Sequence, residues 1–379
     1  MHDIYHKSLI LHQKNKGKMA IISKIPLETK EDLSLAYTPG VAEACRAIAK
    51  DKKLTRELTV KGNAVAVITD GSAILGLGNL GPEAALPVME GKCILFKEFA
   101  GVDAWPICLD TQDTEEIIKT VKQLAPVFGG INLEDISAPR CFEIEQRLKT
   151  ELDIPVMHDD QHGTATVILA GLINALKVRG SDPENVSVVI SGAGAAGVAI
   201  TKLLLAYGFK NIVVCDRQGA IYKNRVGLTP VKAELTLITN KTNKTGDLGE
   251  VLQGADIFIG VSSAGILSTE MVKSMQAKPI IFALANPIPE IMPEEAKKAG
   301  ALIVATGRSD YPNQINNVLI FPGVFRGALD QRVKQITESM LIKAAENLAS
   351  LIKEPTAELI LPSPLDKEAV KVVAAAIKE

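Results

Sequence analysis

Residues 186–200 read VSVVISGAGAAGVAI. An apolar run long enough for a strand is followed by closely spaced glycines and then by an apolar stretch long enough for a helix. The glycines at 192, 194 and 197 form the pattern G-x-G-x-x-G. This pattern indicates dinucleotide binding when a strand precedes it, a helix follows it and an acidic residue ends the next strand about 20 residues on. The next apolar run, NIVVC at 211–215, ends at Asp216. The stretch therefore predicts a βαβ unit of a parallel sheet.

Each glycine has a physical role in such a unit. Gly192 permits the tight turn, Gly194 lets the backbone approach a pyrophosphate, and Gly197 allows the helix and the strand to pack closely. Because the pyrophosphate faces the N-terminus of the helix, where free N–H groups and the helix dipole favour negative charge, the next residues also belong to the predicted cofactor site. The full set there is Gly192, Gly194, Ala195, Ala196 and Gly197.

The two residues at the end of the next strand leave the choice of cofactor open. Asp216 can accept hydrogen bonds from the adenosine ribose, which favours NAD. Arg217, next to it, offers a guanidinium that could bind the 2′-phosphate of NADP. The sequence thus predicts NAD or NADP as cofactor.

The alternation of short apolar runs with longer helical segments extends over all 379 residues and predicts an α/β fold. We expect two domains: an N-terminal α/β substrate domain over residues 1–160, and a Rossmann-type dinucleotide-binding domain with a parallel sheet and C-terminal helices over residues 161–379. Predicted strands cover 64–69, 93–96, 104–109, 127–132 and 154–157, then 186–190, 212–215, 257–261, 279–284 and 302–305. Predicted helices include 163–178, 330–352 and 366–377.

Composition excludes several classes of partner. With 42 Lys and Arg against 44 Asp and Glu, the chain has no excess of positive charge with which to neutralise a nucleic acid backbone. No apolar stretch approaches the ~20 residues that a membrane span needs, and the first residues lack the features of a signal peptide. The five cysteines are odd in number and form no C-x-x-C pair. We expect a reduced, cytoplasmic protein that binds neither nucleic acid nor membrane.

A second G-x-G-x-x-G lies at residues 76–81, but proline follows it at position 82 and no strand with an acidic end comes at the right distance. We interpret TDGSAILGLGNLGP as a tight loop. Its backbone amides either line a substrate site or form a purely structural turn.

Two carboxylate pairs follow strand-like runs: Glu134 and Asp135 after VFGGIN, and Asp159 and Asp160 after IPVM. Both pairs should emerge at the carboxyl edge of a parallel sheet, where α/β proteins bind ligands. Carboxylates gathered there are candidate ligands for a hard divalent cation. Helix N-capping or a surface role is the alternative.

Taken together, these motifs resemble the malic enzymes in their short bacterial form. The resemblance runs in order through AYTPGVAEACRAI, DGSAILGLGNLGPEAALPVMEGKCILF, GGINLEDISAPR, MHDDQHGTA, SGAGAAGVAI, ALANPIPEI and ATGRSDYPNQINNVLIFPGVFRGAL, and it covers nearly the whole chain. It implies oxidative decarboxylation of L-malate to pyruvate and carbon dioxide with NAD or NADP and Mn²⁺ or Mg²⁺. It also implies oxaloacetate decarboxylation and a homodimer.

The resemblance implies a role for each matching residue. Lys92 is the expected base that deprotonates the C2 hydroxyl, which requires that burial and cationic surroundings lower its pKa. Tyr37 is the expected acid that protonates the enolate, and Asp159 the residue that supports Lys92. The expected metal ligands are Glu134, Asp135 and Asp160, and the expected contacts to substrate are Asn286, Asn316 and Asn317, of which Asn286 also contacts the nicotinamide.

One position departs from the larger malic enzymes. They carry an arginine that grips the malate carboxylate in D-G-x-R-x-L-G-L-G, whereas this chain has Ala73 there. The expected substitute donors are backbone amides of residues 76–80 or the side-chain amides of Asn316 and Asn317.

Three rival functions remain at this point. A malolactic lyase, which recycles bound NAD and releases lactate, needs the same residues. An amino-acid or folate dehydrogenase of similar design needs no metal, which the carboxylate set argues against. A dinucleotide-responsive regulatory module would bind the cofactor without turnover.

Overall fold

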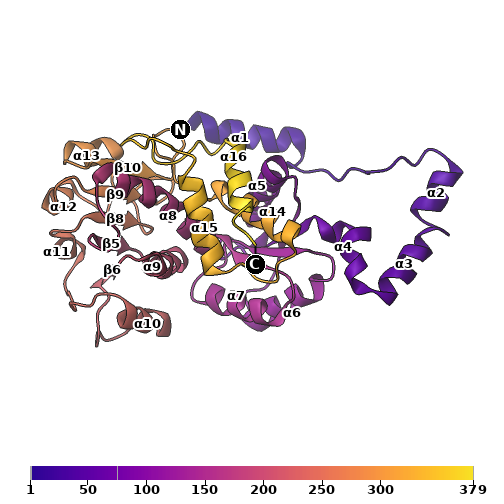
Figure 1. Cartoon of the computed structure of the whole chain (residues 1–379), viewed down its shortest axis with the longest axis horizontal. Coiled ribbons are helices and arrows are strands. Elements are labelled where there is room, and N and C mark those ends of the chain that lie inside the picture. The colour runs from indigo at the N-terminus through magenta and orange to yellow at the C-terminus, as the bar shows by residue number, and fades with distance from the viewer. Residues whose placement is uncertain (1, 75, 379) are drawn as a thin grey trace.

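The computed structural model describes residues 2–74 and 76–378 and forms two sheets joined by a long helix (Figure 1). The first sheet has the strand order β2-β1-β3-β4, and all its neighbouring strands are parallel. Its strands are β1 (Ala64–Thr69), β2 (Asp103–Cys108), β3 (Gly130–Leu133) and β4 (Val156–His158). The predicted α/β class is confirmed.

Helices cover both faces of this sheet. Helices α6 (Thr114–Leu124) and α7 (Arg140–Glu151) bury their apolar sides against one face, and α5 (Pro82–Ala100) packs on the other. The first five residues of β1 are fully buried, as expected for a central strand of a parallel sheet.

The predicted strand at 93–96 is wrong, because these residues lie inside α5. The helix begins at Pro82, a residue favoured in the first turn, and buries Ala85, Met89, Lys92, Cys93 and Phe96 at helical spacing. A short apolar run such as CILF does not by itself distinguish a strand from the buried side of a helix.

Helix α8 (Asp159–Arg179) connects the two sheets and is buried along most of its length. It begins four residues before the predicted start at 163, so Asp159 and Asp160 occupy its first turn. Gly180 ends it with a positive φ, a conformation that glycine adopts without strain.

The second sheet has the order β10-β9-β8-β5-β6-β7, parallel except for the pair β6–β7. Its central strand β5 lies between β8 and β6, so the order reverses beside β5 and creates a crevice at the carboxyl ends of β5 and β8. The strands are β5 (Ser187–Ser191), β6 (Asn211–Asp216), β7 (Gly219–Ala220), β8 (Ile257–Gly260), β9 (Ile280–Ala283) and β10 (Ile303–Thr306). The helices of this part are α9 (Ala195–Tyr207), α10 (Pro230–Ile238), α11 (Leu248–Leu252), α12 (Thr269–Ser274) and α13 (Pro293–Lys298).

The C-terminal segment returns to the first sheet. It consists of η3 (Asn317–Leu319), α14 (Phe321–Gln331), α15 (Glu338–Ala349) and α16 (Lys367–Ala374). Phe96 of α5 contacts the rings of Phe321 and Phe325 at centroid distances of 4.8 and 5.5 Å. The predicted helix at 330–352 is therefore too long, since α14 ends at Gln331 and α15 starts at Glu338.

The N-terminal residues form α1 (His2–Asn15) and then a projecting series of short helices. These are α2 (Lys30–Ala36), α3 (Val41–Lys50), η1 (Lys52–Leu54), α4 (Thr55–Leu58) and η2 (Val60–Gly62). Figure 1 shows α2 and α3 standing well away from the sheets. Among the described residues, no helix combines the length and the apolar character that crossing a membrane requires.

Candidate active site

The predicted acidic residues meet at the carboxyl edge of the first sheet. Glu134 follows β3 directly, and Asp159 and Asp160 follow β4. Because parallel strands end at the same edge, these side chains converge although some 25 residues separate them in the chain. The strand order 2-1-3-4 also reverses between β1 and β3, which is where such sheets bind ligands.

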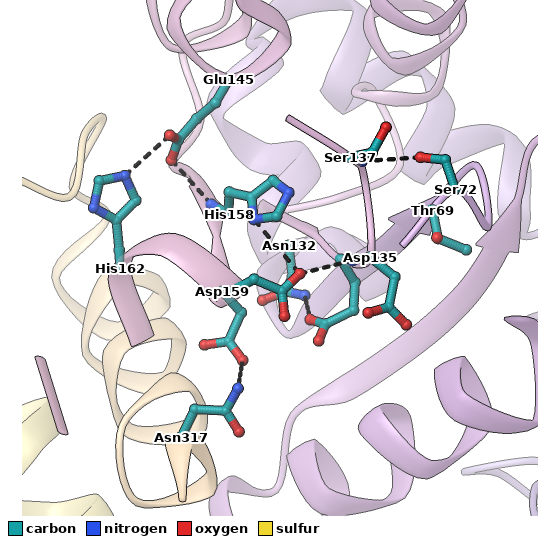
Figure 2. A network of polar contacts seen from close by, with 12 residues as sticks. Thr69, Ser72, Asn132, Asp135, Ser137, Glu145, His158, Asp159, His162 and Asn317 are labelled. Carbon is teal, nitrogen blue, oxygen red and sulfur yellow. Dashed lines mark hydrogen bonds and ion pairs between the residues drawn. The ribbon is translucent and has the colours of Figure 1, made fainter. Parts of the chain in front are cut away.

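Three of these carboxylates form a candidate metal site. Ligand atoms of Glu134, Asp135 and Asp160 all lie within 4.8 Å of one another. The backbone N–H of Asp135 donates to Asp160 Oδ2 at 2.9 Å, and Asn132 Nδ2 donates to Glu134 Oε2 at 2.9 Å (Figure 2). An all-oxygen set of carboxylates suits Mg²⁺ or Mn²⁺.

The electrostatics of this cluster also suit a cation. Burial and, to a smaller extent, the neighbouring Asp160 raise the pKa of Glu134 to about 7, although Lys92 opposes this rise. Burial and the neighbouring Asp159 likewise raise the pKa of Asp160. Lys92 is the charged partner that opposes these shifts, and it does not outweigh burial and the neighbouring acids. A divalent ion at this point would supply further positive charge.

Lys92 is buried between two of the acids. Its Nζ lies 2.6 Å from Asp159 Oδ2 and 2.9 Å from Glu134 Oε1, and 4.1 Å from the centroid of the Phe321 ring. Burial lowers the pKa of Lys92, but the attraction of Asp159 and Glu134 outweighs it, so the net shift is upward. The expected cationic surroundings are therefore absent among the described residues: the neighbours of Lys92 are anionic.

Asn317 reaches the same carboxylate from the C-terminal segment. Its Nδ2 donates to Asp159 Oδ2 at 2.6 Å, as Figure 2 shows. Burial raises the pKa of Asp159 to about 6, while Lys92 opposes this rise. Asn316 accepts a hydrogen bond from the Val318 N–H and caps η3. The structure thus unites Lys92, Asp159 and Asn317 in one buried network.

Glu145 is a member of the site that the sequence did not reveal. Its Oε1 accepts the backbone N–H of His158 at 2.9 Å, and its Oε2 lies 2.9 Å from His162 Nε2 (Figure 2). Lys149 Nζ lies 2.8 Å from Oε1. Burial would raise the pKa of Glu145, but His162 and Lys149 hold it well below its usual range. Glu145 lies in the middle of a helix and belongs to no sequence motif. Its role is visible only in the structure, where α7 packs on the junction of β4 with α8.

Tyr37 lies apart from the buried network of Lys92, Asp159 and Asn317. It lies between α2 and α3 with 67% of its surface exposed, on the segment that projects from the body (Figure 1).

The second glycine-rich stretch forms a loop beside the carboxylates. The N–H of Ala73 donates to the Asp135 carbonyl at 3.0 Å, which links this loop to the metal loop. Two of the amides considered as substrate donors, those of Leu77 and Leu80, are used in bonds inside the loop. A Cβ added at Gly76 would lie 3.1 Å from the Asn286 carbonyl, so this loop approaches the second sheet there.

The G-x-G-x-x-G stretch borders a cavity of about 910 Å³ at the carboxyl ends of β5 and β8. Gly192 has φ +121°, and a Cβ there would come within 2.6 Å of the Val261 carbonyl. A Cβ on Gly197 would lie 1.8 Å from the Gly192 carbonyl, whereas one on Gly194 would point into open space. Gly192 and Gly197 thus make the turn compact, and Gly194 leaves room for a pyrophosphate at the start of α9, where Ala195 and Ala196 lie.

The adenosine end of this cavity carries mixed charge. Asp216 Oδ2 lies 2.5 Å from an Arg225 nitrogen and 2.6 Å from Lys232 Nζ, and the Gln218 N–H donates to Oδ1 at 2.9 Å. Partial burial opposes the shift, but these hydrogen bonds lower the pKa of Asp216 to about 2. Arg217 also lines the cavity.

Asn286 lies exposed after β9, with Nδ2 3.4 Å from the Leu284 carbonyl. The buried carboxylate of Glu290 accepts the N–H groups of Ser262 and Ala285, each at 3.0 Å. Glu290 thus holds together two loops at the carboxyl edge of the second sheet, and was not foreseen from sequence.

Comparison with known proteins gives a consistent result. The model of the malic enzyme N-terminal domain matches residues 14–149, and that of the malic enzyme NAD-binding domain matches residues 161–379. A bifunctional malic/malolactic enzyme of Bacillus subtilis is 58% identical over 98% of this chain and 91% of its own length. An NAD-dependent malic enzyme of Geobacillus stearothermophilus is 59% identical over 96% of this chain and 76% of its own. The crystal structure of an NAD-dependent malic enzyme from Thermotoga maritima superimposes with a TM-score of 0.95 at 52% identity, covering 98% of both chains.

Proposed function

The chain belongs to the malic enzyme family, and from this premise we propose that it oxidises and decarboxylates L-malate to pyruvate and carbon dioxide while reducing NAD⁺ or NADP⁺. Decarboxylation of added oxaloacetate is a second expected activity of the same site. The observation that carries the proposal is the position of Lys92, which lies 2.6 Å from Asp159 and 2.9 Å from Glu134 of the carboxylate cluster.

Residues 1–160 are assigned to substrate and metal binding, and residues 161–379 to the dinucleotide. Glu134, Asp135 and Asp160 would hold Mn²⁺ or Mg²⁺. A divalent ion bound at these carboxylates would supply positive charge, which lowers the pKa of Lys92 and stabilises the negative charge on the enolate oxygen.

The chain's own groups account for the proton movements. Lys92 Nζ removes the C2 hydroxyl proton of malate as hydride leaves C2 for the nicotinamide. Asp159, fixed by Asn317, holds the resulting ammonium in place. Once carbon dioxide has left, Tyr37 protonates C3 of the enolate to give pyruvate.

Substrate and cofactor contacts are assigned to neighbouring loops. We assign contact with malate to Asn286 and Asn316, and contact with the nicotinamide to Asn286 as well. The cavity beside Gly192 and Gly194 is assigned to the dinucleotide, and the cations around Asp216 lead us to propose that both NAD⁺ and NADP⁺ are accepted. The enzyme is proposed to be cytoplasmic and homodimeric.

A malolactic reaction is the second candidate, because the Bacillus subtilis relative is named a bifunctional malic/malolactic enzyme. Product analysis separates the two. Purified protein is incubated with L-malate, Mn²⁺ and either cofactor, and pyruvate, lactate and reduced cofactor are measured together. Equal amounts of pyruvate and reduced cofactor support the malic reaction, whereas lactate without net reduction supports the malolactic one. Absence of every product would overturn both.

A further inference from the structure

Glu290 is a buried acid that the proposed proton movements do not use. It lies between β9 and α13, and its side chain has no exposed surface. A carboxylate that is removed from water is costly unless hydrogen bonds satisfy it. Its Oε1 accepts the Ser262 N–H and its Oε2 accepts the Ala285 N–H, each at 3.0 Å. Burial raises the pKa of Glu290, and the hydrogen bonds from Ala285 and Ser262 oppose this rise.

The last residue of β8, Gly260, makes room for this carboxylate. A Cβ added at Gly260 would lie 2.4 Å from Glu290 Cδ and 2.6 Å from Oε1. Gly260 pairs with Ala283, the last residue of β9, and its carbonyl accepts the Leu284 N–H at 3.0 Å. The carboxylate of Glu290 therefore lies where the neighbouring strands β8 and β9 end, at the edge of the sheet where ligands bind.

The backbone beside Glu290 joins the same two loops. The Leu267 N–H donates to the Glu290 carbonyl at 3.0 Å, and the Gly265 N–H donates to the Pro289 carbonyl at 3.1 Å. The loop that follows β8 is thus bonded to the loop that follows β9 through both the main chain and the side chain of Glu290. The carboxylate fixes the ends of these loops that lie nearest to the sheet.

The loop after β8 is packed against the G-x-G-x-x-G turn. A Cβ added at Gly192 would come within 2.6 Å of the Val261 carbonyl, and the Val261 N–H donates to the Ser191 carbonyl at 2.9 Å. The hydroxyl oxygens of Ser191 and Ser262 lie 3.1 Å apart, and Ser262 borders the proposed cofactor cavity. The position of this loop is therefore tied to that of the turn assigned to the pyrophosphate.

The loop after β9 carries Asn286, which follows Ala285 directly. The Asn286 side chain is exposed, and a Cβ added at Gly307 would lie 2.8 Å from its Nδ2. A Cβ added at Gly76 would lie 3.1 Å from the Asn286 carbonyl, so Asn286 faces the glycine-rich loop of the first sheet. The place of Asn286 between the two sheets depends on the backbone at Ala285, which Glu290 holds.

We infer that Glu290 is a positioning residue for hydride transfer, because its carboxylate fixes Asn286 relative to the turn that binds the pyrophosphate. This inference rests on the proposed function, which assigns Asn286 to both malate and the nicotinamide. Glu290 lies beneath its loops and acts through Asn286 rather than on either ligand. A misplacement of about 1 Å by a residue far from the chemistry can lower a rate about 100-fold.

A double-mutant cycle tests this inference. In Glu290→Gln the amide keeps one accepting oxygen but turns an NH₂ group toward the other N–H, so one of the two loops is released. The kcat for malate oxidation should fall about 100-fold and the KM for malate should rise, as in Asn286→Ala. In the Asn286→Ala background, Glu290→Gln should lower kcat/KM by less than about twofold further, because the residue through which it acts is already gone.

The outcomes that would overturn the inference are distinct. Losses that multiply in the double variant would show that Glu290 acts independently of Asn286, and wild-type kinetics in either single variant would remove the link. A merely structural role would reduce the amount of folded enzyme, and so lower kcat at an unchanged KM in both backgrounds. Failure of the proposed function differs from all of these, since the wild-type enzyme itself would then not oxidise malate.

Two further variants keep the test decisive. Glu295→Gln is the matched control, because Glu295 is an exposed acid in the first turn of α13, and it should keep wild-type kinetics. Glu290→Asp keeps the charge but shortens the side chain by one methylene, and it takes the place of Glu290→Gln in the cycle if the glutamine variant does not fold.

Discussion

Among single residues, Asp159 is the one that holds the proposed base, Lys92, in position. It accepts hydrogen bonds from Lys92 and Asn317, each at 2.6 Å, from helices far apart in sequence. The order of the motifs predicts that Lys92 and Asp159 share one site. The sequence around Asn317 does not indicate that this residue contacts Asp159. That contact depends on the return of the C-terminal segment to the first sheet.

The Asn317→Ala variant tests this role. A hydrogen bond to a charged group is worth about 1.5–3 kcal/mol, so losing it should misplace Lys92 and lower kcat about tenfold or more. The KM for malate should change little, because the side chain points at Asp159. Steady-state kinetics separates the two effects, and a raised KM with an unchanged kcat would instead make Asn317 a direct substrate contact.

Asp216 is the residue that we expect to limit the use of NADP⁺. Asp216→Asn removes a negative charge close to the expected 2′-phosphate while Arg217, Arg225 and Lys232 remain. The ratio of kcat/KM for NADP⁺ to that for NAD⁺ should rise about tenfold, equivalent to roughly 1.4 kcal/mol. Asp182→Asn, in an exposed turn, is the control. A ratio that does not change would show that the cations already neutralise the carboxylate.

The low pKa of Asp216 also predicts how the cofactor preference depends on pH. Its pKa is lowered from 3.8 to about 2, so its contribution to folding is complete above the unfolded value and is lost only as pH falls toward about 2. Cofactor preference should therefore stay constant between about pH 6 and 8. A preference that changed within this range would mean that another group controls it.

At the level of secondary structure, the junction of β4 with α8 positions two carboxylates of the proposed site. Asp159 and Asp160 form the first turn of α8, and Glu145 of α7 ties down that turn through the His158 N–H and His162. The sequence pattern predicted a helix start at 163, whereas α8 begins at Asp159. The true start depends on contacts with α7, which local sequence does not encode.

Glu145→Gln should loosen this junction. The amide can still accept the His158 N–H but cannot replace the charge that faces His162 and Lys149. Supporting residues of this kind typically change metal affinity 10- to 100-fold, so the Mn²⁺ dissociation constant should rise about tenfold, with kcat largely restored at saturating Mn²⁺.

Isothermal titration of Mn²⁺ measures this directly. Glu143→Gln is a matched control, because Glu143 lies on the same helix but is exposed. Unchanged Mn²⁺ affinity in Glu145→Gln would reduce Glu145 to a purely structural role.

The predictions from sequence succeeded where a motif and its element are local. The strand β1 covers the predicted residues 64–69, and the G-x-G-x-x-G turn has the geometry that its glycines require. They failed where distant segments decide the outcome. CILF became part of a helix because α14 covers it, and the position of Tyr37 depends on the projecting N-terminal helices, whose direction no local pattern specifies.

At the scale of the whole molecule, the C-terminal segment joins the two halves. Phe325 of α14 is fully buried against Phe96 of α5, although more than 200 residues separate them in the chain. Replacing a buried Phe by Ala costs about 3–5 kcal/mol, so Phe325→Ala should lower the free energy of unfolding by that amount.

The fluorescence of Trp105 reports this effect, since it is the single tryptophan and lies on β2. Its urea transition should move to lower denaturant in Phe325→Ala and stay in place in Leu365→Ala, an exposed position in the same C-terminal segment. A Trp105 transition unaffected by Phe325→Ala would mean that the first sheet folds independently of the tail.

We propose that Lys92 and three carboxylates form one metal-dependent catalytic centre for malate. The most direct measurement is the initial rate of malate-dependent NAD⁺ or NADP⁺ reduction by the wild-type enzyme with Mn²⁺, after chelation, and after Mn²⁺ is restored. Chelation should abolish the rate and Mn²⁺ should restore it, because Glu134, Asp135 and Asp160 supply an all-carboxylate site beside the base. Full activity after complete removal of divalent ions would contradict it.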